Sequence, residues 1–315
     1  MPFAINHPYP ISELKGTLFL MAGAFMISFS AVFVKLVQVG PTTAGVYRTL
    51  FGGIILAGMA LARGEKWWRG WPAFGLTFLG GVFFAFDLSF WHRSVHLVGP
   101  GLSTILANFQ VFFLAGVGIL VLKEKAGLRL LVAIPLAMAG LGLLMGLHRG
   151  LPSQAHQMGV FLGVLTAMAY ASYILSLRKL HSLKRRPSVL VNMAIVSLIT
   201  AGLMAAETVF TGEELYIPDA ASWTWLVTYG IFGQVLGWVF ISRGLPSTPA
   251  SRAGLVLLLQ PTLSFIWDML FFKRSTDAPE LLGAVLAVAG IYLGTVRMGR
   301  PLPGGKGRVI TGNDK

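Results

Sequence analysis

The sequence contains no cysteine and few charged residues, and both shortages narrow what the protein can be. Without cysteine it has no disulfides, no thiolate catalysis and no cysteine-type zinc sites. Charged residues make up only 12% of the 315 residues, while 55% are hydrophobic. An ordinary soluble domain is about 25% charged. Because a water-soluble core cannot hide that much apolar surface, we predict that the solvent of this protein is the lipid bilayer.

The sequence also lacks the motifs of several enzyme classes. It has no HExxH, no glycine loop that cradles phosphate and no nucleotide-binding motif, and its six histidines are scattered. We therefore expect no enzyme activity, no metal and no cofactor. A net charge of +13 would suggest a nucleic-acid partner for a soluble protein. In a membrane protein, basic residues collect in cytoplasmic loops during insertion, so we expect no nucleic acid.

Ten apolar blocks each approach the roughly 20 residues that cross ~30 Å of hydrocarbon. They lie at 16–34, 42–62, 71–92, 98–122, 128–147, 157–177, 188–208, 222–242, 250–272 and 280–297. The first is longer than a signal-peptide core of roughly 7 to 15 residues and is expected to be retained. Most connections are short, which leaves no room for a soluble domain. The prediction is an all-α membrane protein with ten transmembrane helices.

The basic residues predict the orientation of these spans. With a cytoplasmic N-terminus, most of the 25 Lys and Arg fall on the cytoplasmic side. They include the loops around Arg63, Lys123 and Arg185 and a basic tail at 299–315. This asymmetry places both termini in the cytoplasm and supports an even number of spans. We expect a multi-pass protein of the cell membrane, the inner membrane of a bacterium.

The chain repeats itself without a gap when shifted by 150 residues. The shift aligns Gln110 with Gln260, Lys123 with Lys273, and Ala139-Gly140 with Ala289-Gly290. Chance matches are common among Leu and Ala, so the Gln and Lys matches carry the argument. The predicted repeats, 16–148 and 157–298, hold five spans each, an odd number. The second repeat therefore enters the membrane inverted, an architecture of secondary transporters whose substrate site lies near the midplane between the repeats.

Several motifs resemble one family, the EamA-type permeases of the drug/metabolite transporter superfamily. They are Pro41-x6-Arg48, Leu122-Lys-Glu124, Leu136-Ala-Met-Ala-Gly140, and Gln260-Pro261 through Leu286-Ala-Val-Ala-Gly290. The resemblance extends from about Gly16 to Arg297, although Arg274 stands where the family pattern usually repeats the acidic residue. It implies ten helices around a central cavity lined by helices 1, 3, 4, 6, 8 and 9. It also implies export of amino acids, related metabolites or toxic organic compounds.

Two ionisable residues, Arg48 and Asp87, are predicted to lie within the hydrocarbon. Such a group costs about 2.5 to 3.5 kcal/mol on insertion scales, so each needs a partner or a task. Counted from the outer ends of their spans at ~1.5 Å per residue, their depths agree within ~3 Å. They can therefore form a structural ion pair. Alternatively, Asp87 faces the cavity and exchanges a proton or binds a cationic group.

Neutral amides also lie at mid-membrane depth, at Gln110, Gln234 and Gln260. An amide offers donors and an acceptor without charge, which suits zwitterionic or polar solutes. The alternative is hydrogen bonding between helices, worth about 0.6 kcal/mol each. Asn108 stands ~200° around the helix from Gln110, so at most one of the two points squarely into the cavity.

Aromatic side chains accompany two of these polar groups. Trp238 follows Gln234 by four residues and Trp91 follows Asp87 by four, so each ring lies on the same helix face as its polar group. Such pairs could bind an apolar or cationic group by stacking or cation–π contact. Tyr170 is a further cavity candidate. Tryptophans near a membrane surface are more often interfacial anchors. This is the alternative role for Trp91, and it is the role that we assign to Trp67, Trp68 and Trp71.

Two residues concern helix packing and motion. Ser28 lies one turn after Ala24 on a face of small residues, which permits tight packing or sliding between helices. Pro261, in the middle of the ninth span, removes one backbone hydrogen bond and is expected to kink or hinge that helix.

These observations favour a secondary transporter, an exporter of amino acids or related small metabolites that works by alternating access, with protons as candidate coupling ions. One alternative is uptake or exchange of phosphorylated or nucleotide-linked metabolites. Another is a receptor or scaffold without transport. The partners expected are a small-molecule substrate and lipid, and the protein is either a monomer or a homodimer.

Overall fold

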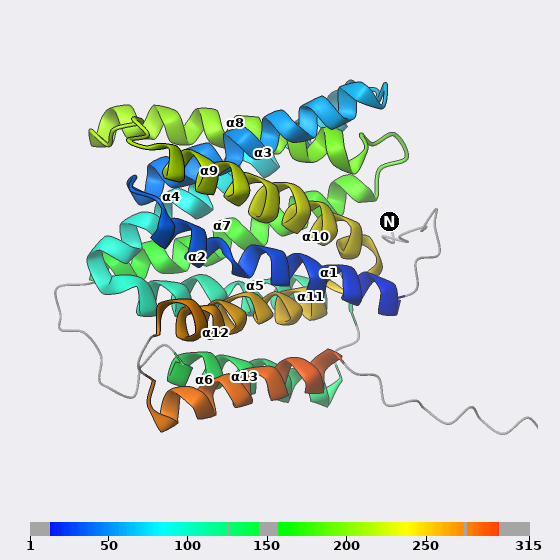
Figure 1. Ribbon diagram of the computed structural model, residues 1–315. Coiled ribbons are helices and arrows are strands. Elements are labelled where there is room, and N and C mark those ends of the chain that lie inside the picture. Colours follow the sequence, from blue (N-terminus) through cyan, green and yellow to red (C-terminus); the bar gives the residue numbers. More distant parts are fainter. Residues whose placement is uncertain (1–12, 125–126, 145–156, 274–275, 296–315) are drawn as a thin grey trace, which may run out of the picture.

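The computed structural model describes residues 13–124, 127–144, 157–273 and 276–295, and all regular structure within these ranges is helical. Figure 1 shows the helices side by side in one bundle. The α-helices are α1 (Glu13–Ser28), α2 (Ser30–Leu36), α3 (Pro41–Ala62), α4 (Trp71–Asn108), α5 (Gln110–Leu120), α6 (Leu128–Leu144), α7 (Gln157–His181), α8 (Val189–Thr211), α9 (Ala220–Tyr229), α10 (Trp238–Gly244), α11 (Ala250–Leu257), α12 (Leu259–Phe272) and α13 (Ala278–Thr295). A π-helical segment, Gly230–Gly237, joins α9 to α10, and a 3-10 turn, Leu245–Ser247, follows α10. The predicted tail at 299–315 lies outside the described residues.

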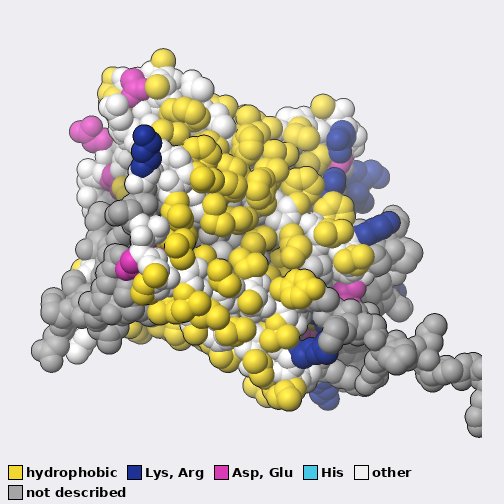
Figure 2. All heavy atoms as spheres, turned by 60° about the horizontal axis from the view of Figure 1, so that its bottom comes forward, with side chains coloured by type: hydrophobic (Ala, Val, Ile, Leu, Met, Phe, Trp, Pro, Cys, Tyr) yellow, Lys and Arg dark blue, Asp and Glu magenta, His cyan; other side chains and the backbone are white. Residues whose placement is uncertain are grey.

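The all-helical membrane architecture is confirmed. Among the residues described, seven helices are long and apolar enough to cross a bilayer, and three shorter apolar helices lie at Leu106–Leu120, Leu128–Leu143 and Ala278–Gly294. The count of ten crossings stays a prediction, since these three are shorter than 18 residues. Figure 2 shows one face of the molecule as a broad apolar band with charged side chains gathered at its two ends, mostly Lys and Arg at one of them. Such a band is the surface that hydrocarbon would cover.

Helix α4 covers the third predicted segment, 71–92, and the first part of the fourth, 98–122, yet the chain bends back within it. The hydroxyl oxygens of Ser94 and Ser103 lie 2.9 Å apart. Nine residues of straight α-helix would separate them by ~13.5 Å. The backbone therefore bends sharply between Ser94 and Ser103 while it stays locally helical.

Several helices are interrupted near their middles. Turns at Phe109 and Leu258 separate α4 from α5 and α11 from α12. Pro261 explains the second break, because it has no N–H to donate to the carbonyl of Leu257. At the first break, Asn108 donates from its side-chain nitrogen to the carbonyl of Thr104 at 2.7 Å, competing with the backbone bond of the helix. Corresponding helices of the two repeats are thus broken at nearly corresponding positions.

The crossing of α6 and α13 displays the relation between the repeats directly (Figure 1). A Cβ atom at Gly140 would lie 2.4 Å from the backbone nitrogen of Ala287, and one at Gly290 would lie 2.7 Å from that of Ala137. These positions are equivalent under the 150-residue shift, so each helix presents the same residues to the other. Reciprocal contact of this kind is the signature of a two-fold relation. The glycines let the two backbones touch.

Acidic residues of the connection between α8 and α9 form hydrogen bonds with the helices beside it. Glu213 accepts a hydrogen bond from the backbone N–H of Thr43 at 2.8 Å, at the start of α3. Asp219 caps α9 by accepting from the backbone N–H of Ser222 at 2.7 Å and from its hydroxyl at 2.8 Å. These hydrogen bonds hold the pKa of Asp219 below its ordinary value.

Candidate functional site

Arg48 on α3 and Asp87 on α4 are both buried, with 5% and 9% of their surfaces exposed. The predicted ion pair between them is not formed in this structure. Instead, the Arg48 guanidinium donates to the Tyr229 hydroxyl at 3.1 Å and to the Gly233 carbonyl at 3.4 Å. Gly233 permits this approach, because a Cβ there would lie 3.3 Å from the Nε of Arg48. Both residues are buried as predicted, but the Arg48 side chain points toward α9 and the π-helical segment and not to Asp87.

The carboxylate of Asp87 is consequently left without a direct partner. Within the described residues it makes no hydrogen bond and no ion pair. It lies near enough to Arg48, Tyr170 and Tyr173 for electrostatic interaction with each of them. An ionisable group in this position is costly and marks a pathway for substrate or ions in membrane proteins.

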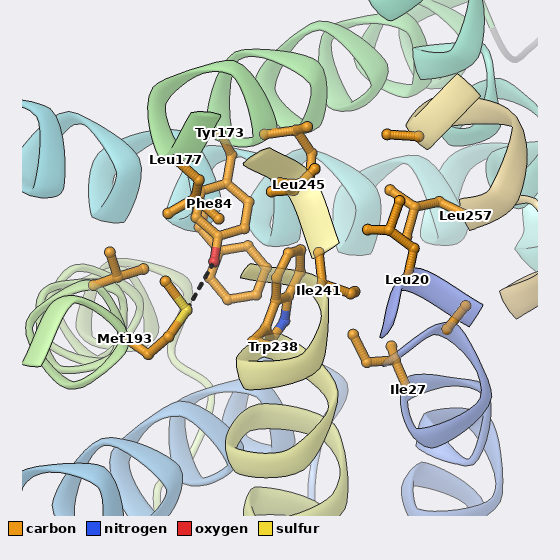
Figure 3. Close-up of a cluster of buried hydrophobic side chains, with 14 of the residues drawn as sticks. Leu20, Ile27, Phe84, Tyr173, Leu177, Met193, Trp238, Ile241, Leu245 and Leu257 are labelled. Atoms are coloured by element: carbon orange, nitrogen blue, oxygen red, sulfur yellow. Dashed lines mark hydrogen bonds between the residues drawn. The ribbon is translucent and has the colours of Figure 1, made fainter. Parts of the chain in front are cut away.

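Four aromatic side chains from α4, α7 and α10 converge beside Asp87, and we call them the aromatic cluster: Phe84, Tyr170, Tyr173 and Trp238. The ring centroid of Trp238 lies 4.7 Å from that of Tyr173, 5.2 Å from Phe84 and 5.9 Å from Tyr170. Figure 3 shows Phe84, Tyr173 and Trp238 meeting at the centre of the buried core. The guanidinium carbon of Arg48 lies 5.9 Å from the ring centroid of Phe84, so the cluster connects the two charged residues.

Three buried polar atoms around the aromatic cluster have no hydrogen-bond partner among the residues that the structure describes: Tyr170 Oη, Trp238 Nε1 and Arg48 Nε. Most buried polar atoms in proteins are paired, and leaving one unpaired costs about 1–3 kcal/mol. These atoms come from three different helices. Together with the Asp87 carboxylate they provide donors and acceptors that a small polar solute could satisfy.

The predicted amides are placed differently from one another. Gln234 donates from Nε2 to the hydroxyl of Ser197 at 2.8 Å, an interhelical bond, while its Oε1 has no partner. Gln110 is buried at the start of α5 with an unpartnered Oε1. Gln260 is half-buried in α12 and makes no hydrogen bond within the described part of the chain. Asn108 is bonded to its own helix, as described above, so of the two neighbouring candidates Gln110 is the one left available.

Ser28 and Trp91 lie apart from the aromatic cluster. Ser28 accepts a hydrogen bond from Trp267 Nε1 at 2.7 Å, and the Trp267 ring stacks on Phe29 with centroids 4.6 Å apart. Ser28 therefore fixes α1 to α12. Trp91 is half-buried and contacts the ring of His92, its neighbour in sequence. Sequence reasoning missed Trp267, because nothing in its pattern distinguishes it from an interfacial anchor.

One end of the bundle is closed by contacts that join the first half of the chain to the second. Glu124 accepts hydrogen bonds from the backbone N–H of Ala250 at 2.7 Å and the hydroxyl of Ser251 at 2.9 Å, at the start of α11. The same carboxylate pairs with Arg178 at 3.3 Å, at the end of α7. A second ion pair joins Glu13 to Arg252. We call these two carboxylates and their partners the inter-repeat latch, and it lies at the end predicted to be cytoplasmic.

Replacing Glu124 by glutamine is expected to destabilise the protein by about 1–3 kcal/mol, because hydrogen bonds to a charged group contribute about 1.5–3 kcal/mol. The thermal midpoint of the purified protein in lipid measures the effect. Glu214→Gln is the matched control, since that side chain is exposed and makes no hydrogen bond or ion pair with described residues. Its midpoint should stay near that of the unmodified protein, and an equal midpoint for both variants would contradict the latch.

The comparisons with known proteins agree with this architecture. The family model described as the EamA-like transporter family matches residues 14–146 and 157–296. A curated relative, an "Uncharacterized transporter" of Archaeoglobus fulgidus, is 22% identical over 173 residues, which cover 54% of this chain and 58% of the relative. A solved structure titled "Crystal structure of protein" superposes with a TM-score of 0.78 at 19% identity, over 89% of this chain and 98% of the other. At that identity the likeness shows a shared fold.

Proposed function

Because this chain belongs to the EamA-like transporter family, we propose that it exports amino acids or related small organic metabolites across the cell membrane. The observation that carries the proposal is the carboxylate of Asp87 beside the aromatic cluster, which makes no hydrogen bond or ion pair with any residue that the structure describes. A carboxylate that receives no hydrogen bond and no direct ion pair from the described residues is available to a mobile partner, either the solute or a proton.

The chemistry around the aromatic cluster suits a solute with both a positive and a negative group. Asp87 would receive an ammonium group, while Arg48 and Trp238 Nε1 would donate to a carboxylate or carbonyl oxygen. The rings would contact the organic side chain, and a cation over such a ring gains about 0.5–2 kcal/mol. Since Asp87 and Arg48 do not form a direct ion pair, neither charge has to be freed before the solute binds.

The helix interruptions support alternating access. Discontinuous helices at corresponding positions of two inverted repeats accompany midplane substrate sites in transporters. Here the breaks at Phe109 and Leu258 precede Gln110 and Gln260, and Pro261 provides the hinge in α12. Opening of the latched end would separate Glu124 from α11, because these contacts join the two repeats.

The phosphorylated or nucleotide-linked solutes fit this site less well. Such anions call for several basic partners. Of the Lys and Arg that the structure describes, Arg48 alone is buried. A receptor or scaffold without transport would leave the unpartnered polar atoms without a purpose.

Flux into proteoliposomes tests the proposal. The reconstituted protein should accumulate a labelled zwitterionic amino acid in counterflow, faster than a sugar phosphate, and an imposed pH gradient should change the rate if a proton is coupled. Empty liposomes and an excess of unlabelled solute are the controls. Flux restricted to sugar phosphates, or no flux for any solute above that of empty liposomes, would refute the assignment.

A further inference from the structure

A surface cleft of about 330 Å³ lies at the Lys- and Arg-rich end of the bundle and is lined by Trp68, Arg69, Gly70 and Arg185. Arg69 belongs to the connection between α3 and α4, and Arg185 to the connection between α7 and α8. The cleft therefore lies between one connection from the first half of the chain and one from the second half. Nothing in the transport mechanism above uses it.

Within the described part of the chain, no acidic side chain pairs with the two arginines of the cleft. Neither Arg69 nor Arg185 makes a hydrogen bond or ion pair with the residues that the structure describes. Glu65, an acidic residue of the same connection as Arg69, already accepts a hydrogen bond from Ser188. Two guanidinium groups sharing one cleft repel each other. An anion between them would remove that repulsion, and guanidinium groups bind phosphate with matching geometry.

Exposed rings lead from the cleft along α4 and define what we call the aromatic ladder: Trp68, Trp71, Phe74 and Phe78. Their exposed fractions are 55%, 74%, 36% and 45%. Successive ring centroids lie 5.0, 6.1 and 6.3 Å apart, so the ladder is continuous. Tryptophans at the start of a transmembrane helix lie at the level of the lipid headgroups. The cleft is thus at headgroup depth, and the ladder descends into the hydrocarbon.

We propose that this cleft binds the phosphate of an anionic phospholipid, with one acyl chain lying along the aromatic ladder. The two arginines contact the headgroup from opposite halves of the chain, so the lipid connects the repeats at this end. Basic pockets at the cytoplasmic side of helical membrane proteins bind anionic headgroups. A free phosphate ion would meet the same arginines but would leave the ladder uncovered.

Lipid retention tests the proposal with the full-length protein. Purified protein is exchanged into mixed micelles containing phosphatidylglycerol or phosphatidylcholine, and bound lipid is counted by native mass spectrometry. Phosphatidylglycerol should be retained at least tenfold better than phosphatidylcholine, and the double variant Arg69→Gln/Arg185→Gln should lose that preference. The control Arg63→Gln/Lys184→Gln removes the same charge from the same two connections outside the cleft and should keep it. Equal retention by the two double variants would overturn the proposal.

Two further measurements distinguish a lipid phosphate from a free phosphate ion. The first uses the unmodified protein, so it does not depend on a variant that could fail to fold. A photoactivatable phosphatidylglycerol, crosslinked to the unmodified protein, should label the segment from Trp68 to Phe78. Labelling elsewhere only would overturn the site. Inorganic phosphate at millimolar concentration should not displace the lipid, and Trp71→Ala should weaken lipid retention. If phosphate displaces the lipid and Trp71→Ala retains it unchanged, the cleft is a site for a soluble anion and the proposal is overturned.

Discussion

Replacing Asp87 by asparagine is expected to reduce solute flux at least tenfold, or to abolish its dependence on pH, without destabilising the fold. An ionised carboxylate in hydrocarbon costs about 2.5 to 3.5 kcal/mol on insertion scales. Since Asp87 has no direct partner within the described residues, the asparagine removes that cost and breaks no hydrogen bond. The thermal midpoint should therefore stay equal or rise while transport falls. Flux in proteoliposomes and thermal unfolding of the same preparation measure the two effects.

Glu207→Gln is the matched control for this experiment. Glu207 accepts a hydrogen bond from Ser89 at 2.7 Å and pairs with Arg93 at 2.9 Å, so its charge is already used within the protein. Its loss should lower stability modestly and leave flux within about twofold, since a partly exposed pair contributes about 0.2–1 kcal/mol. Normal, pH-dependent transport by Asp87→Asn would exclude a role for that carboxylate. A lower midpoint for Asp87→Asn than for Glu207→Gln would point to a structural role instead.

Replacing Gly140 by alanine is expected to destabilise the protein strongly for a change of one methyl group. The new Cβ would lie 2.4 Å from the backbone nitrogen of Ala287 and 2.7 Å from the carbonyl oxygen of Gly283. Backbone atoms cannot move aside as the end of a flexible side chain can, so α6 and α13 must separate. Overpacking of this kind costs about 1–3 kcal/mol. The expected result is a thermal midpoint several degrees lower.

The repeat relation supplies a second test of the same crossing. Gly290→Ala should cost about as much as Gly140→Ala, because its Cβ would meet Ala137 in the equivalent way. Gly58→Ala is the control: apart from the neighbouring backbone of its own helix, no described atom lies within 4 Å of a Cβ at that position. Alanine there should leave stability unchanged or raise it by up to about 1 kcal/mol. If all three variants unfold at the same temperature, the close approach of α6 and α13 is wrong.

Much of the fold could be predicted because composition and length settle it. Uninterrupted apolar blocks exclude a water-soluble core, and the 150-residue shift identified Gly140 and Gly290, which the structure brings into reciprocal contact. The break near Pro261 was also predictable, since proline lacks the N–H that a helix requires. The break at Phe109 was not. It has no proline, and the Asn108 bond to Thr104 that accompanies it depends on a side-chain orientation that one sequence does not reveal.

In the candidate site, too, the sequence predicted where residues lie along their helices but not where their side chains point. Residue counting placed Arg48 and Asp87 at similar depth, and both are buried. It could not give the direction of the guanidinium, which turns toward the π-helical segment because Gly233 leaves room beside its carbonyl. A face argument also assumes about 3.6 residues per turn, which a π-helical stretch does not follow. Gln234 and Trp238, expected on one face, consequently contact different neighbours: Ser197 on α8, and Phe84 and Tyr173 on α4 and α7.

The inter-repeat latch stabilises closure of the bundle at one end, and the sequence does not repeat it at the other. The conformations closed at the two ends should therefore differ in free energy. Glu124 binds Arg178 and the start of α11, whereas the chain carries Arg274 at the position equivalent to Glu124. Each 1.4 kcal/mol of such a difference changes the ratio of two conformations about tenfold. If the proposed transporter alternates between two conformations, the one with the latched end closed is expected to be the more populated. The binding site would therefore be open to the two sides of the bilayer for unequal fractions of the time. Half-saturating solute concentrations measured from the two sides should differ.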